Sequence, residues 1–171
     1  RVRELDAENL PALRALATIH ERGGDVEELV EVLLAEAGLQ RGDKDKALSL
    51  IRVAELCEER LDRADRAAEL YEEVLRLGHG LDASLRALVR IYSAEGMWNA
   101  LSRALKTACD NARDDASRAA MLVRSAEVAG DRLHNLDSAA DLLEQALELS
   151  SDIGVLTRLE RVSMARRDWR R

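Results

Sequence analysis

The sequence offers few side chains in the patterns that carry chemistry. Its histidines are His20, His79 and His134, and its cysteines are Cys57 and Cys109. No histidine belongs to an HExxH pair or lies near a cysteine at zinc-ligand spacing, and neither cysteine has a CxxC partner. We therefore expect no metal site and no cofactor.

Paired carboxylates occur at Glu27-Glu28 and Glu72-Glu73, where they could in principle serve as general acid and base. In a chain with 35% charged residues such pairs are expected to be a solvated helix surface. The sequence also lacks a GxSxG nucleophile turn, a GxxxxGK phosphate loop and a GxGxxG dinucleotide loop. We predict that the chain is not an enzyme.

Charge and composition limit the classes of partner that the chain is expected to bind. The chain has 26 basic and 33 acidic residues, a net charge of −7, and 2% aromatic residues. Binding to nucleic acid needs a cationic face, and binding to single strands also needs aromatic side chains for stacking. We therefore expect no nucleic-acid partner. The sequence contains no run of about 18 apolar residues, which is the length needed for a membrane span, so we expect no membrane insertion. Two isolated cysteines favour a reducing, cytoplasmic location.

The elements that position these residues are expected to be helices. The 171 residues include no Phe and one Pro, whereas β-rich folds use aromatic and β-branched residues and many Gly/Pro turns. The sequence therefore predicts an all-α fold.

The chain contains an internal repeat of 72 residues. When residues 10–77 are compared with residues 82–149, 24 of 68 positions are identical without a gap. A third copy begins near the C-terminus one residue out of step, because Leu156 and Leu159 align with Leu85 and Leu88. The chain starts and stops within a repeat, so we interpret it as a fragment of a longer protein.

Each 72-residue unit divides into two helical hairpins, and glycines such as Gly24, Gly42, Gly80 and Gly96 separate successive helices. We expect Asp43, Asp82 and Asp152 to cap helix starts, because a carboxylate can accept the free N–H groups of a first turn. Apolar spacing predicts helices over 9–22, 25–40, 44–61, 64–77, 81–95, 97–112, 115–131, 135–149 and 153–166. We predict one repeat array over 1–171, with hairpins at 9–41, 43–78, 81–113 and 115–150 and partial hairpins at 1–8 and 152–171.

The hairpins resemble the tetratricopeptide repeat (TPR) family. Ala139, Leu143 and Ala146 follow the family's small–bulky–small pattern for a second helix, and Ala67, Tyr71 and Val74 nearly do. First-helix spacing is matched by Leu50, Val53, Ala54 and Cys57, and by Leu85, Leu88, Val89 and Tyr92. The resemblance covers nearly the whole chain in a degenerate form and implies a right-handed α-α superhelix, or solenoid.

The resemblance also implies a function. TPR arrays bind a peptide or helix of a partner protein along a concave groove lined by the first helices, and exposed groove positions map onto Arg14, Thr18, Glu55, Arg86, Arg90 and Glu127. We expect arginines there to meet acidic side chains or backbone carbonyls. Uncapped repeat ends are also expected to favour self-association.

Alternatives remain for these residues and for the whole chain. Arg52 with Glu55, and Arg124 with Glu127, are one helical turn apart and could simply pair. Arg60 with Asp65, and Arg132 with Asp137, could likewise clamp the hairpin turn. The chain could also be a sensor or spacer segment of a larger regulatory or cell-envelope protein.

Two tryptophans, Trp98 and Trp169, stand at equivalent repeat positions just after a hairpin turn. An exposed tryptophan could anchor a partner. Repetition at a fixed position favours a wedge that seals the two helices of a hairpin.

Overall fold

The computed structural model describes residues 9–169, with side chains to residue 166, and all of its regular secondary structure in that range is helical. The chain divides into two units, residues 1–87 and 88–171. Unit 1 contains α1 (Leu10–Gly23), α2 (Val26–Leu39), α3 (Asp43–Glu59) and α4 (Ala64–Arg76). Helix α5 (Leu81–Ala94) begins in unit 1 and ends in unit 2.

Unit 2 continues with α6 (Trp98–Asp110), α7 (Asp115–Glu127), the π-helix η1 (Val128–Arg132), α8 (Leu136–Leu149) and α9 (Ile153–Trp169). The nine α-helices of residues 9–169 lie within a few residues of their predicted positions, which confirms the all-α repeat class. Two boundaries differ from expectation: the seventh helix changes to π geometry at Val128, and the last helix continues to Trp169. The predicted partial hairpin at 1–8 lies outside the described residues.

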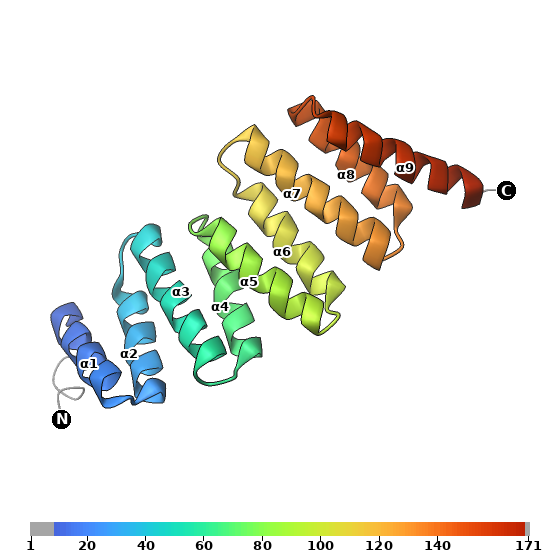
Figure 1. Cartoon of the computed structure of the whole chain (residues 1–171). Helices are drawn as coiled ribbons and strands as arrows, with labels where there is room; N and C mark the ends of the chain where they lie inside the picture. Colours follow the sequence, from blue (N-terminus) through green and yellow to red (C-terminus); the bar gives the residue numbers. More distant parts are fainter. Residues whose placement is uncertain (1–8, 170–171) are drawn as a thin grey trace. The chain divides into compact units, whose positions relative to one another are not determined.

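Within each unit, consecutive helices pack side by side (Figure 1). In unit 1, α1 contacts α2, α2 contacts α3, and α3 contacts α4; in unit 2, α6 contacts α7, α7 contacts α8, and α8 contacts α9. One hairpin alone cannot bury its apolar stripe, so each hairpin is stabilised by its neighbour.

The core of each unit combines alanines, which allow close helix approach, with leucines that fill the remaining space. In unit 2 the central cluster is Ala119, Leu122, Ala126, Ala129, Ala139, Leu143, Ala146 and Val155. In unit 1 the residues with at most 1% exposure include Ala37, Ala47, Val53, Ala54, Cys57, Ala67, Val74 and Leu75. Each fully buried Leu or Val contributes about 1.5–3 kcal/mol relative to an exposed one.

The repeat is also visible in the turns. Gly24 and Gly96, 72 positions apart, have left-handed φ values of 79° and 67°. The next amide in each case, of Asp25 or Met97, donates to a carbonyl of the preceding helix, at 3.0 Å to His20 and 2.8 Å to Tyr92. These bonds end α1 and α5 in the same way.

The second turn of each repeat uses a residue other than glycine. Asp62 and His134 have φ values of 54° and 53°. The following amides, of Arg63 and Asn135, donate to the carbonyls of Cys57 and Ala129, both at 2.8 Å. The two copies therefore share backbone geometry at positions where their side chains differ.

Helix starts agree only partly with expectation. Asp152 caps α9, because its carboxylate accepts the Gly154 N–H at 2.8 Å. Asp43 and Asp82, also expected as caps, lie in the first turns of α3 and α5 instead. Capping residues that were not expected are Asn9, Asp114 and Asn135.

We predict that Gly96→Ala lowers the free energy of unfolding by about 1 kcal/mol, because a Cβ is unfavourable in left-handed backbone. Gly38→Ala is the matched control. Gly38 lies inside α2 with no atom within 4 Å of an added Cβ, so alanine there should raise stability by up to about 1 kcal/mol. Urea unfolding followed by circular dichroism measures the free energy of unfolding of both variants. Equal changes in the two variants would contradict the explanation that left-handed backbone at Gly96 disfavours a side chain.

Ser84 on α5 generates a second prediction. Its side chain is fully buried, and its hydroxyl has no partner among the described residues. The aligned positions in the other copies hold Ala12 and Val155. Ser84→Ala should therefore raise the unfolding free energy by about 1 kcal/mol, since an unpaired buried hydroxyl is removed. Ser125→Ala should not, because Ser125 donates to the Met121 carbonyl at 2.9 Å.

Asp114 makes α7 sensitive to acid. The Ser117 backbone N–H donates to its carboxylate at 2.7 Å, and the Ser117 hydroxyl donates to the other oxygen at 3.0 Å. The backbone bond first, and then the hydroxyl, lower the pKa of the Asp114 carboxyl below its usual range. The cap therefore stabilises the fold above the ordinary carboxyl pKa and is lost as the pH falls through the lowered value.

We predict that Asp114→Ala destabilises the chain at pH 7 and that its difference from wild type narrows progressively below about pH 4. Asn135→Ala removes an uncharged cap, which accepts the Ser138 N–H at 3.0 Å, and should cost about 1 kcal/mol at either pH. Urea unfolding at pH 7 and at pH 3 compares the variants. A constant deficit for Asp114→Ala would contradict this explanation.

Candidate functional site

The first two predicted groove residues, Arg14 and Thr18, lie on α1 in unit 1. The Arg14 Nε donates to Glu36 Oε1 at 2.9 Å, and the Glu36 residue on α2 is 8% exposed. The Thr18 hydroxyl donates to the Arg14 carbonyl at 3.0 Å. Arg14 thus joins the two helices of the first hairpin, while its side chain remains 60% exposed.

Glu55 is exposed on α3, and its expected partner makes a different contact. Arg52 Nη2 lies 2.7 Å from Glu21 Oε1 on α1. The alternative of pairing within one helix is therefore wrong for Arg52. The side chain reaches the neighbouring first helix instead, where an exposed ion pair contributes at most about 1 kcal/mol.

Arg86 and Arg90 are both exposed and lie one turn apart on α5. The boundary between the two units falls between them, so each is described with its own unit. Their role in binding stays a prediction.

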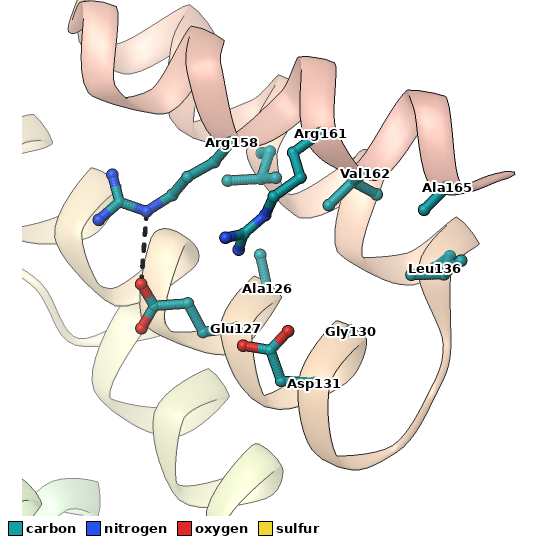
Figure 2. A pocket seen from close by; sticks show the side chains of 10 residues that line it. Ala126, Glu127, Gly130, Asp131, Leu136, Arg158, Arg161, Val162 and Ala165 are labelled. Atoms are coloured by element: carbon teal, nitrogen blue, oxygen red, sulfur yellow. Dashed lines mark ion pairs between the residues drawn. The ribbon is translucent and has the colours of Figure 1, made fainter.

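Glu127, the last predicted residue, lies at the wall between two cavities of unit 2. The larger cavity, of about 250 Å³, lies between the first helices α7 and α9 and over the second helix α8. Its apolar lining consists of Ala126, Leu136, Leu143, Val162 and Ala165. Its polar lining consists of Glu127, Asp131, Arg158 and Arg161 (Figure 2).

The smaller cavity, of about 230 Å³, is lined by α5, α6, α7 and η1. The Arg132 guanidinium lies over the Trp98 ring, 4.7 Å from its centroid, so η1 is attached to the start of α6 by a cation–π contact. The predicted Arg132–Asp137 clamp is wrong, because Asp137 Oδ1 pairs with Arg166 Nη2 at 2.7 Å.

Trp98 is half-buried and faces this cavity together with Val89, Leu101 and Leu105. This position agrees with a wedge rather than a fully exposed anchor. The side chain of its predicted counterpart, Trp169, lies outside the described residues.

The ion pair made by Glu127, which lines both cavities, also differs from expectation. Glu127 Oε1 lies 3.4 Å from Arg158 Nε on α9, so Glu127 is not paired with Arg124 one turn earlier. Both α3 and α7 therefore connect to a neighbouring first helix through a charged pair. Both cavities are lined by Glu127 and by Asp131 of η1.

Asp131, Arg158 and Arg161 line the larger cavity but were not among the predicted site residues. The repeat alignment contained a signal for one of them, because Arg161 occupies the position of Arg90 and Thr18. No comparable signal marks Arg158, since its equivalents are Ala15 and Ala87.

The last helix exposes apolar side chains. Leu156 is 42% exposed, whereas its repeat equivalents Leu13 and Leu85 are 4% and 1% exposed. Self-association through repeat ends stays a prediction for this face.

Residues 9–166 contain no group of three or more His, Cys, Asp or Glu side chains placed to hold a metal ion. None of the described helices combines the length and apolar character needed to cross a bilayer. Burial raises the pKa of the Cys57 and Cys109 thiols, which disfavours their nucleophilic thiolate forms.

Comparisons with known proteins address the family and the fold. Residues 12–47 match the sequence model of the tetratricopeptide repeat family. None of the curated proteins matches the chain in sequence. A crystal structure described as nearly identical TPR-like repeats of a kinesin light chain from Podosopora anserina has a TM-score of 0.50 and 21% identity, covering 95% of this chain and 89% of that one.

TPR repeats in general mediate protein–protein interaction and are typically scaffolds without catalytic activity. The 72-residue repeat, the helical hairpins, the family match over 12–47 and the structural likeness agree with one another. The chain is therefore an array of TPR-like helical hairpins.

Proposed function

We propose that this chain is a protein-interaction scaffold that binds a peptide or helix of a partner protein along its first helices. The observation that carries the proposal is the pair of cavities in unit 2. Each lies beside first helices and over a second helix, and the two share Glu127 and Asp131. Adjacent hollows with apolar floors and charged rims suit successive side chains of one bound segment.

The charges at this face are of both signs, which suits a polypeptide partner. The acidic residues are Glu127 and Asp131, and the basic residues are Arg124, Arg132, Arg158 and Arg161. Groups of both signs can meet side chains and backbone amides of a polypeptide. Within unit 2 we assign Arg90 to the proposed face, and within unit 1 we assign Arg14, Thr18, Glu55 and Arg86 to that unit's own first-helix face.

A displayed random-peptide library selected on the immobilised chain tests this function. We expect the selected peptides to lose about tenfold in affinity when Arg161→Ala, or Arg86→Ala together with Arg90→Ala, removes a charged hydrogen-bond donor. Fluorescence anisotropy with the labelled peptide measures affinity, and circular dichroism verifies that the variants remain folded.

The matched controls are Arg103→Ala on α6 and Gln145→Ala on α8, exposed residues of second helices that line neither cavity. They should leave affinity unchanged. If the controls weaken binding and the first-helix variants do not, the binding face has been assigned to the wrong side of the hairpins.

A further inference from the structure

The larger cavity of unit 2 has a size that limits what it can hold. An apolar cavity of about 150 Å³ accommodates a benzene ring, whereas pockets for drug-sized ligands begin near 300 Å³. At about 250 Å³, this cavity has room for one aromatic or large aliphatic side chain, but it is small for a nucleotide or a cofactor.

Its floor and its rim differ in chemistry. Leu136 and Leu143 come from α8, and Val162 comes from α9, so the floor is apolar and favours a hydrocarbon group. Charged groups line the opening toward α7, η1 and α9. The cavity therefore matches a ligand with an apolar end and a polar end.

Only two of the four charged side chains at the rim are paired with each other. Glu127 and Arg158 lie 3.4 Å apart and neutralise each other. Asp131 and Arg161 have no ion-pair partner in the described part of the chain, and both are exposed. Figure 2 shows the Arg161 guanidinium reaching into the cavity from α9, with the Asp131 carboxylate facing it from η1.

A carboxylate accepts hydrogen bonds and a guanidinium donates them. A peptide amide presents both complements, an N–H for Asp131 and a carbonyl for Arg161. A carboxylate or ammonium ligand would satisfy one of the two and be repelled by the other, so the opposed charges favour an uncharged group with both functions.

We infer that this cavity is the subsite for one bulky apolar side chain of a bound peptide, whose adjacent backbone amide is held between Asp131 and Arg161. The inference rests on the proposed function and identifies which part of the partner enters the groove. It requires neither charge nor a chain terminus on the ligand.

The test uses N-acetyl-phenylalaninamide, which carries one phenyl ring between two amides. Two matched probes separate the contributions: N-acetyl-glycinamide has the amides without the ring, and benzyl alcohol has the ring without an amide. We expect saturable amide shifts in the ¹H–¹⁵N spectrum of the full chain, at η1, α8 and α9, with the first probe binding at least about tenfold more tightly than either control.

Variants of the chain assign the contacts. Asp131→Ala and Arg161→Ala should each weaken the first probe by about tenfold and leave benzyl alcohol unchanged, while Arg103→Ala should alter neither. Leu143→Tyr should block the cavity, and the chain already buries Tyr71 at the equivalent position of the first copy. Asp131 and Arg161 are exposed, so their variants decide the outcome even if Leu143→Tyr fails to fold.

Equal affinity for N-acetyl-phenylalaninamide and benzyl alcohol, or no loss in Asp131→Ala and Arg161→Ala, would overturn the amide contact. Absence of saturable shifts at the cavity would overturn the subsite. Either result leaves the scaffold function standing if library peptides still depend on Arg86 and Arg90. Conversely, probe binding that depends on Asp131 and Arg161, together with library peptides insensitive to Arg86→Ala with Arg90→Ala, would keep the subsite and contradict a binding face that continues along the other first helices.

Discussion

Close stacking of alanine-rich helices governs how the hairpins of this chain pack. A two-helix hairpin exposes its own apolar stripe, so it is stable only where a neighbour covers that stripe. Ala54 and Ala67 in unit 1, and their equivalents Ala126 and Ala139 in unit 2, are at most 3% exposed at such contacts. Larger side chains there would hold the helices apart, and the leucines between them would lose their packing.

The same constraint produces the candidate site. Small residues bring the backbones of successive helices together, but they leave space where a first helix meets the next first helix over a second helix. In unit 2 that space is bordered by Ala126 and Ala165 and closed below by Leu143. Charged side chains at its edge remain accessible, because the repeat uses only the inner stripe of each helix for packing. The candidate site and the core thus both follow from the repeated small residues of the stacked helices.

The helices and their order could be predicted from the sequence, because apolar spacing and the repeated glycines Gly24 and Gly96 are local signals. The partners in the ion pairs could not be predicted from the sequence. Arg52 and Glu127 have partners in their own helices at suitable spacing, yet each contacts the adjacent first helix, because long side chains extend across the narrow gap between stacked helices. Asp131 was missed for a similar reason: its position depends on the π-turn that follows α7, which has no simple sequence signal.

Amide hydrogen exchange of the full chain, measured with and without a library-selected peptide, shows which helices the peptide covers. We expect the peptide to slow exchange most in α7, η1 and α9, and least at Arg103 of α6 and Gln145 of α8, which line neither cavity. Slower exchange confined to α6 and α8, with α7 and α9 unaffected, would contradict the assignment of the first helices as the binding face.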